Sequence, residues 1–216
     1  MLKHLYDLIF PSKCIFCRKV LSKDETDLCH KCRENAPEFQ KSKNKYSFIA
    51  RWTAVWYYKD MARRSILRYK FYRNLSFSRA FARFLAMKLQ REGFETFDLM
   101  TWVPVSRQRK SKRGFDQVEL LAHHVGKELS ITPVKTLIKI RNNPPQSSIV
   151  GAAARRANVL GVYRVTDPQL IQGKRILLLD DVITTGATAS ECARTLLSAG
   201  AKEVIFAAIA TAAYEN

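Results

Sequence analysis

The chain has 216 residues, of which 47% are hydrophobic, so it can bury one sizeable core together with a small appendage. It contains no internal repeat or single-residue tract, which excludes a solenoid or a disordered protein. Its 37 basic and 19 acidic residues give a formal charge of +18, and such an excess attracts anionic substrates and polyanions. Charged residues interrupt every apolar stretch, including the weak run at 1–10, so we expect a cytoplasmic protein without a transmembrane segment.

Two Cys-x-x-Cys pairs stand near the amino terminus and are separated by eleven residues; they are Cys14 with Cys17 and Cys29 with Cys32. Each pair can hold one side of a tetrahedral ion, and four thiolates are typical of a closed, structural Zn²⁺ site. Disulfides and an iron–sulfur cluster are the alternatives, but nothing marks the chain as secreted and this spacing favours zinc. We therefore predict a zinc module that ends near Pro37, with a Lys-rich linker after it.

The patterning divides the chain into the zinc module with its linker at 1–45 and an α/β domain at 46–216. The elements expected in this second domain are, in chain order, a strand or hairpin at 46–58, helices at 61–70 and 77–90, a first core strand at 97–105, a basic loop at 106–117, a helix at 118–129, strands at 135–140 and 159–165 around a long polar loop, a strand from 176 and a last strand at 204–211. We expect one sheet of about five mostly parallel strands. A polar loop as long as the one between 141 and 158 is usually functional, and we expect it to close over a substrate.

The most informative run is Ile176–Thr188, with the sequence ILLLDDVITTGAT. Its aliphatic residues predict a buried parallel strand, and ligands of α/β sheets bind beyond the carboxyl ends of such strands. Asp180 and Asp181 stand at that end, where they can accept hydrogen bonds from the vicinal hydroxyls of a sugar. A helix amino terminus favours a phosphate, and the residues that would hold it are Thr184, Thr185, Gly186, Ala187 and Thr188. The run therefore predicts a ribose 5-phosphate site; the alternative is an ordinary strand–turn–helix with a solvated pair of carboxylates.

This run resembles the phosphoribosyl pyrophosphate (PRPP) signature of type I phosphoribosyltransferases at each of its thirteen positions. The resemblance implies that Asp180 and Asp181 are the catalytic residues and hold the ribose hydroxyls and the waters of a Mg²⁺ ion that bridges PRPP. A second cationic turn, at Arg113 and Gly114, precedes the helix at 118–129 and is predicted to hold the pyrophosphate. A solvated basic loop is the alternative for that turn.

Ten basic residues lie between Lys59 and Arg91, against Asp60 alone. Pyrophosphate needs only a few cations, so single-stranded DNA is the leading explanation for this surplus, and a generally basic surface is the alternative. On the helix at 77–90 we expect Arg79, Arg83 and Lys88 to lie outside the apolar stripe, on an exposed face.

Further motifs occur in a fixed order along the chain. They are the four cysteines, Lys70 after a short helix, Val-Pro-Val before the basic loop, Arg-Gly-Phe-x-Gln, and Gln146-Ser with Arg-x-x-Asn in the long loop. Together they resemble the ComF family, also called the competence protein F or GntX-like family, over almost the whole chain. The chain departs from that pattern at Asp116, where Asn is common, and at Ser106, where Pro is common; Asp116 is expected to weaken anion binding in the pyrophosphate turn.

The ComF resemblance implies a phosphoribosyltransferase-like domain that binds PRPP with Mg²⁺ and acts in DNA uptake during natural transformation, through binding of single-stranded DNA. It adds Arg156 to the pyrophosphate site as a cation of the closing loop, and it implies a competence helicase or other DNA-processing proteins as partners. The alternative function is a nucleotide-salvage phosphoribosyltransferase that transfers phosphoribose to a nitrogen nucleophile. The sequence leaves the acceptor and the existence of turnover open.

Overall fold

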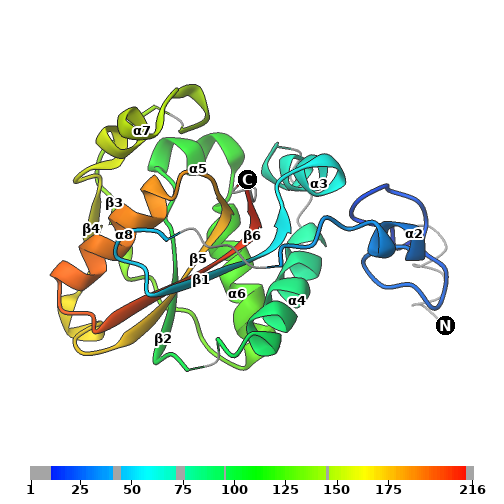
Figure 1. The fold of residues 1–216 in the computed structure, drawn as a ribbon, viewed down its shortest axis with the longest axis horizontal. Coiled ribbons are helices and arrows are strands. Elements are labelled where there is room, and N and C mark those ends of the chain that lie inside the picture. Colours follow the sequence, from blue (N-terminus) through cyan, green and yellow to red (C-terminus); the bar gives the residue numbers. More distant parts are fainter. Residues whose placement is uncertain (1–10, 41–44, 72–75, 95, 145, 213–216) are drawn as a thin grey trace.

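The computed structural model describes residues 11–40, 45–71, 76–94, 96–144 and 146–212. The apolar run at 1–10 and most of the second half of the predicted linker lie outside these ranges. A parallel sheet flanked by helices forms the body of the chain, and the amino-terminal cysteine module projects from one side of it (Figure 1).

The central sheet has four parallel strands in the order β1-β6-β5-β2. Their bounds are Arg51–Tyr57 for β1, Leu99–Trp102 for β2, Arg175–Ile183 for β5 and Glu203–Thr211 for β6. The inner strands β5 and β6 are nearly continuous apolar runs, as expected for parallel strands that are covered on both faces. The last strand, predicted at 204–211, is thus confirmed, whereas β5 continues past the carboxylate pair to Ile183 instead of ending before it.

The prediction of one sheet with about five strands is wrong in two respects. The segment at 46–58 contributes β1, an edge strand of the central sheet that pairs with β6, so the strand at 97–105 is not the first core strand. The segments at 135–140 and 159–165 contribute only β3 (Leu137–Lys139) and β4 (Tyr163–Val165), which form a separate antiparallel pair. Inner strands of the central sheet are covered by helices on both faces and need buried side chains on both. The side chains of β3 and β4 are mostly half-buried or exposed, so these short strands do not meet that requirement.

The helices of the described residues are α2 (His30–Glu34), α3 (Asp60–Phe71), α4 (Ser76–Arg91), α5 (Arg107–Arg113), α6 (Gln117–Leu129), α7 (Ala152–Val159) and α8 (Ala187–Ser198), with 3₁₀ turns η1 (Gln146–Ser148) and η2 (Pro168–Leu170). Alternate residues of β5 face opposite layers. Leu177 and Leu179 belong to the core with α4 and α6, while Leu178 belongs to the core with α8. The sheet is therefore covered on both faces, with its carboxyl edge left for a site.

Two segments that the sequence predicts as loops contain helices. In 106–117, α5 is capped by the Ser106 hydroxyl, which accepts from the Arg109 N–H at 3.3 Å, and it ends at Gly114, whose φ is 79°. In 141–158, η1 and α7 occupy much of the chain. Neither α5 nor α7 presents a long apolar stripe, and Val159 is the one buried residue of α7, so a search for helical periodicity misses both.

The zinc module shares its core with the second domain. Phe16 lies edge-to-face against Trp56 of β1, with ring centroids 5.1 Å apart, and both belong to one buried cluster. The first residues of the predicted linker continue this contact, because the Phe39 N–H donates to Val55 O at 3.0 Å. These residues are thus fixed to β1, and the domain limits at 45 and 46 stay a prediction.

The helix predicted at 77–90 forms as α4, but two of its three basic residues are not available to a ligand. Lys88 is 4% exposed, donates to Phe39 O at 2.5 Å and pairs with Glu92 at 2.7 Å. Arg83 pairs with Asp27 of the zinc module. Of these three residues Arg79 alone is exposed, so the expectation that all three share an exposed basic face is wrong. The helical pattern shows that Arg83 and Lys88 lie outside the apolar stripe, but it cannot show that other segments of the chain pack over them.

Candidate functional site

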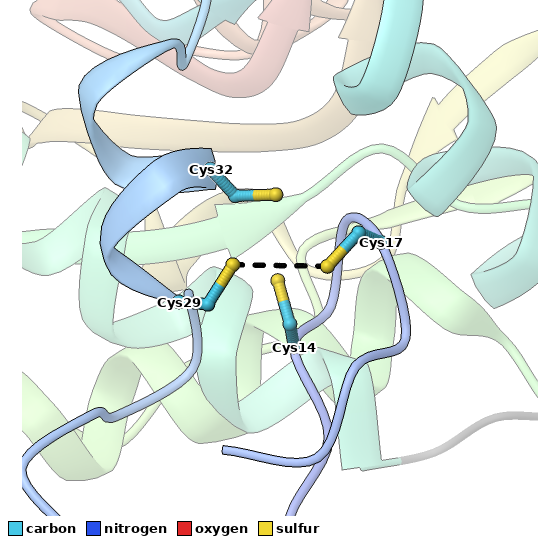
Figure 2. Close-up of side chains that lie close together, drawn as sticks. All are labelled: Cys14, Cys17, Cys29 and Cys32. Carbon is cyan, nitrogen blue, oxygen red and sulfur yellow. Dashed lines mark hydrogen bonds between the residues drawn. The ribbon is translucent and has the colours of Figure 1, made fainter. Parts of the chain in front are cut away.

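The four amino-terminal cysteines converge on one point (Figure 2). Their sulfur atoms all lie within 4.8 Å of one another, and Cys17 Sγ is 3.7 Å from Cys29 Sγ. A tetrahedral zinc with Zn–S bonds of about 2.3 Å requires sulfur–sulfur separations of about 3.8 Å, so the cluster fits that ion. Burial would raise the pKa of the Cys14 thiol, but hydrogen bonds from the backbone of Cys17 and Cys29 outweigh it and hold that pKa at about 7. The cluster is a closed structural zinc site.

A cavity of about 960 Å³ opens at the carboxyl end of β5. It has the size of a site for a small molecule. Its walls come from five parts of the chain: Tyr58 after β1 with Lys70 and Phe71 of α3; Ser106, Gln108, Arg109 and Gln117 at α5 and α6; Lys139 of β3; Asn143, Gln146 and Arg155 from the segment after β3; and Asp180 to Ala189 from β5 and α8. The structure therefore brings both predicted carboxylates and all five predicted phosphate-binding residues to one cavity.

The two carboxylates of the cavity have different surroundings. Asp181 is 5% exposed, and its Oδ1 accepts from Lys70 Nζ at 2.8 Å while its Oδ2 accepts from Gln117 Nε2 at 3.2 Å. Asp180 accepts from the Asp181 N–H at 2.7 Å. Burial and the adjacent charge of Asp181 raise the pKa of Asp180 well above its usual value, and the ammonium of Lys70 opposes this rise. Asp181 is thus held in place by two side chains, whereas Asp180 is the carboxylate that gains most from a bound cation.

The predicted phosphate loop forms a tight turn into α8. Gly186 caps this helix with a φ of 73°, a conformation that favours glycine. Tyr46 packs on the outside of the turn, and its hydroxyl donates to Thr184 O at 3.4 Å. Gln146 Nε2 lies 3.4 Å from Thr188 Oγ1 and connects the turn to the segment that follows β3. The turn is thereby held at the amino terminus of α8 by contacts from two distant segments.

The predicted pyrophosphate residues do not all meet in the cavity. Arg113 is the last residue of α5, and Gly114 closes that helix with its N–H on Lys110 O at 2.8 Å. Arg156 is exposed, while its neighbour Arg155, which is the first residue of the Arg-x-x-Asn motif, lines the cavity. The Arg155 Nε donates to Ile149 O at 2.8 Å. The structure therefore offers Arg155 rather than Arg156 as the cavity-facing arginine of this motif.

Two further cations line the same cavity. Arg109 of α5 donates to Asn143 O at 3.2 Å. Lys139 of β3 is half-buried, and burial together with the nearby charge of Arg109 lowers its pKa to about 8. Asp116, in contrast, is buried and accepts from the N–H groups of Val118 and Glu119 as the cap of α6. Its carboxylate is occupied with backbone donors, and its effect on anion binding stays a prediction.

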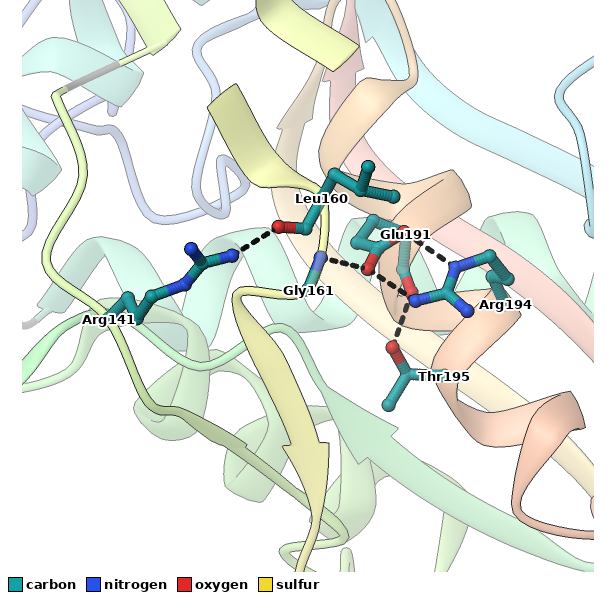
Figure 3. A network of polar contacts seen from close by, with 6 residues as sticks. All are labelled: Arg141, Leu160, Gly161, Glu191, Arg194 and Thr195. Carbon is teal, nitrogen blue, oxygen red and sulfur yellow. Dashed lines mark hydrogen bonds and ion pairs between the residues drawn. The ribbon is translucent and has the colours of Figure 1, made fainter. Parts of the chain in front are cut away.

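The two ends of the long segment after β3 are joined to each other and to α8 (Figure 3). Arg141 donates to Leu160 O at 2.5 Å, and the Gly161 N–H donates to Glu191 Oε1 at 2.7 Å. Glu191 also pairs with Arg194 at 2.7 Å, on the helix that starts at the phosphate loop. The base of the segment is therefore fixed at both ends, and the closure expected from the sequence is confined to the residues between them.

Three side chains of the site follow from no spacing rule. Lys70 enters the sequence argument only as part of the family pattern, Gln117 only as the last residue of Arg-Gly-Phe-x-Gln, and Tyr46 not at all. Each reaches the site from a distant part of the chain, since Lys70 and Asp181 are 111 positions apart in the sequence. Hydrophobic periodicity reports which residues are buried, and it carries no information on such long-range polar pairs.

Comparison with known proteins agrees with this architecture. A family model described as phosphoribosyl transferase domain matches residues 112–215, and one described as double zinc ribbon domain matches residues 5–43. Among curated proteins, the DNA utilization protein YhgH of Escherichia coli O157:H7 is 30% identical over 62% of this chain and 60% of its own length. Competence protein F of Haemophilus influenzae is 25% identical over 90% of this chain and 95% of its own. Among solved structures, the glutamine PRPP amidotransferase of B. subtilis gives a TM-score of 0.45 at 22% identity, over 65% of this chain and 30% of that chain.

These findings make the chain a phosphoribosyl transferase-domain protein with an amino-terminal zinc ribbon. Within that class it is similar to competence protein F over most of its length, in line with the resemblance that the order of its motifs predicts. In the part of the chain that the structure describes, the helices are all too short or too polar to cross a membrane.

Proposed function

We propose that this chain binds Mg²⁺ and PRPP in the cavity at the end of β5. The observation that carries the proposal is the meeting, in one cavity, of a carboxylate pair, a phosphate-type turn at the start of α8 and the cations Arg109 and Lys139. Thr184 to Thr188 would hold the 5-phosphate. Asp180 and Asp181 would hold the ribose hydroxyls and the waters of Mg²⁺, an ion that usually keeps several waters and binds substrate phosphates.

The pyrophosphate would lie on the cationic side of the cavity. Arg113 and Gly114 remain our proposal for part of this subsite, and Arg109 and Lys139 add cations that line the cavity. Arg155 replaces Arg156 in the proposal, because its side chain faces the cavity. When bound, Mg²⁺ would neutralise part of the pyrophosphate charge, and the residues between Asn142 and Asn158 would exclude water from the activated sugar.

We further propose a role in DNA uptake, with single-stranded DNA as the partner and a cytoplasmic location in which the zinc-binding thiols stay reduced. The names of the relatives support the first part. The proposal of single-stranded DNA as the partner is supported by the start of α3 and the segment before it. Lys59, which precedes α3, and Arg63 of α3 are exposed near Tyr58, and the Arg63 guanidinium lies 6.0 Å from the Tyr58 ring. Phe71 ends the same helix at the cavity and is 61% exposed. Basic residues interleaved with aromatic rings are typical of single-strand binding surfaces. A competence helicase or another DNA-processing protein would be a further partner.

The aromatic pair at the cavity, Tyr58 and Phe71, also favours the second candidate function, transfer of phosphoribose to a nitrogen nucleophile on a flat base. In that reaction the nitrogen lone pair forms a bond to C1 of the ribose. The bond from C1 to the pyrophosphate oxygen breaks, pyrophosphate leaves with the electron pair, and the acceptor nitrogen loses its proton to pyrophosphate or solvent.

Calorimetry with Mg²⁺ and PRPP tests the proposal. Asp180→Asn should weaken binding by about 10- to 100-fold, because a charge-assisted interaction of about 1.5–3 kcal/mol is lost. Asp167→Asn is the matched control, since Asp167 caps η2 away from the cavity and Asn is an equally good cap. Equal affinity in Asp180→Asn and wild type would refute the site. Incubation of labelled PRPP with a panel of nucleobases and single-stranded DNA then separates the two functions, since only the enzyme produces pyrophosphate.

A further inference from the structure

Helix α3 connects the zinc module with the carboxylate pair, and Figure 1 shows it between the module and the central sheet. At the module, Arg68 Nη1 donates to Phe16 O at 2.8 Å. Phe16 lies within the turn of the first Cys-x-x-Cys pair, between Cys14 and Cys17. Cys32 Sγ also lies 3.8 Å from the sulfur of Met61, in the first turn of the same helix. The zinc module thus holds α3 at both ends of its length.

The last turn of α3 is equally well fixed at the cavity. Lys70 pairs with Asp181 at 2.8 Å, and the side chains of the two residues are 18% and 7% exposed. The hydroxyl of Tyr69, which is fully buried, donates to Gln117 O at 2.5 Å, and Gln117 in turn holds the other oxygen of Asp181. Arg68, Tyr69 and Lys70 are therefore three consecutive residues that contact the zinc module, the start of α6 and the carboxylate pair.

We propose that α3 is a rigid connection through which the zinc module positions Lys70 on Asp181, so that zinc loading sets the affinity of the cavity for Mg²⁺ and PRPP. The proposal rests on the PRPP site proposed above. Phe16 O can accept from Arg68 only while the Cys14–Cys17 turn is folded, and zinc holds that turn. Because successive residues of a helix move together, a displaced Arg68 displaces Lys70.

The position of Lys70 matters because the carboxylate pair is poor in cations. Asp180 faces the carboxylates of Asp181 and Asp116 from β5 and the start of α6, the buried Tyr163 and Cys192 from β4 and α8, and Lys70 from α3. Lys70 is the cation of this group that lowers the pKa of Asp180. A displaced Lys70 therefore leaves the two adjacent carboxylates without the cation that contacts Asp181 at 2.8 Å.

The decisive variant is Arg68→Met, which keeps the apolar stem and removes the donor to Phe16 O. Arg64→Met is its matched control, since Arg64 is an exposed arginine on the same helix. One readout needs no PRPP: the rate at which an amine-reactive acylating reagent modifies Lys70, followed by mass spectrometry in the zinc-loaded protein. The other readouts are calorimetry with Mg²⁺ and PRPP, and the zinc content of each variant.

In zinc-loaded Arg68→Met we expect faster acylation of Lys70 and PRPP binding about 3- to 30-fold weaker, the range usual for coupling between distant sites, while Arg64→Met matches wild type. Lys70→Met should weaken PRPP binding as Arg68→Met does, and Lys70→Arg should restore it because it keeps the cation on Asp181. Unchanged acylation and affinity in Arg68→Met would overturn the connection. If wild type binds no PRPP, the PRPP site fails, but the acylation rates still decide whether the zinc module holds Lys70 in place.

Discussion

The ring of Tyr46 occupies the space that a side chain on Gly186 would need. A β-carbon built on Gly186 would lie 2.1 Å from Cδ1 of Tyr46, and the φ of 73° at Gly186 already disfavours other residues. A residue from the start of the second domain thus fills the outer side of the phosphate turn.

Gly186→Ala should therefore lower the free energy of unfolding by more than the strain of a positive φ, because the new methyl group would also clash with Tyr46. Gly173 is the matched control, because its φ is 68° and nothing lies within 4 Å of the position that a β-carbon would take there. Gly173→Ala should cost about 1–2 kcal/mol of unfolding free energy from backbone strain, and Gly186→Ala should exceed it through the clash. Chemical denaturation measures both, and equal losses would show that Tyr46 moves aside without cost.

Asp180 is expected to lower the stability of the unliganded fold. Burial and the charge of Asp181 raise the pKa of Asp180 in the folded state. Between pH 3.8, the usual pKa of an aspartate, and this raised pKa, the folded protein holds a proton that the unfolded chain has already released. Stability then falls as pH rises from that value toward the raised one. Asp180→Asn should raise the melting temperature at neutral pH, with a difference that disappears at acidic pH. A pH-independent difference would contradict this assignment.

Glu191 should contribute stability because it connects α8 to the turn after α7. Burial would raise its pKa, but Arg194 and the Gly161 N–H outweigh this and lower it below its ordinary value of 4.5. Glu191→Gln should cost about 1–3 kcal/mol at neutral pH, and the difference from wild type should shrink as pH falls through the lowered pKa. Glu128→Gln, an exposed change on α6, is the control for denaturation.

The zinc module should unfold together with the second domain. Phe16, Leu28 and Cys32 share a buried cluster with Trp56, so loss of zinc opens a core that both parts use. We expect about one Zn²⁺ per chain, and Cys32→Ser should lose it and lower a single thermal transition. Two separate transitions would show that the parts are independent, and iron with a visible charge-transfer band would identify a different metal site.

Single-stranded DNA binding, if it uses α3, should depend on salt and on Lys59 and Arg63. The logarithm of affinity should fall by about 0.7 per phosphate contact for each tenfold increase in salt, and replacing both residues by Gln should flatten that slope. Lys174→Gln with Lys202→Gln is the matched control, since these exposed lysines precede β5 and β6 at the opposite edge of the sheet. Equal slopes for the two double variants would remove α3 as the DNA surface.

A feature that a few neighbouring residues define can be predicted from the amino-acid sequence without knowledge of the fold. The two Cys-x-x-Cys pairs predict the zinc site, and the thirteen residues from Ile176 to Thr188 predict the strand, the carboxylates at its end and the turn into α8, because a few adjacent residues carry each pattern. Helix α4 follows from apolar residues at helical spacing, and the similarity to competence protein F follows from the order of the motifs.

Contacts between distant side chains, in contrast, depend on how the whole chain folds. Lys70 and Gln117 hold Asp181, Tyr46 packs on Gly186, and Lys88 is covered by Phe39. Helical periodicity identifies the face of a helix that is buried, but which segment covers the rest depends on chain topology. For that reason α4 looks basic and exposed in the sequence, while in the folded chain the zinc module and the residues that follow it occupy two of its cations.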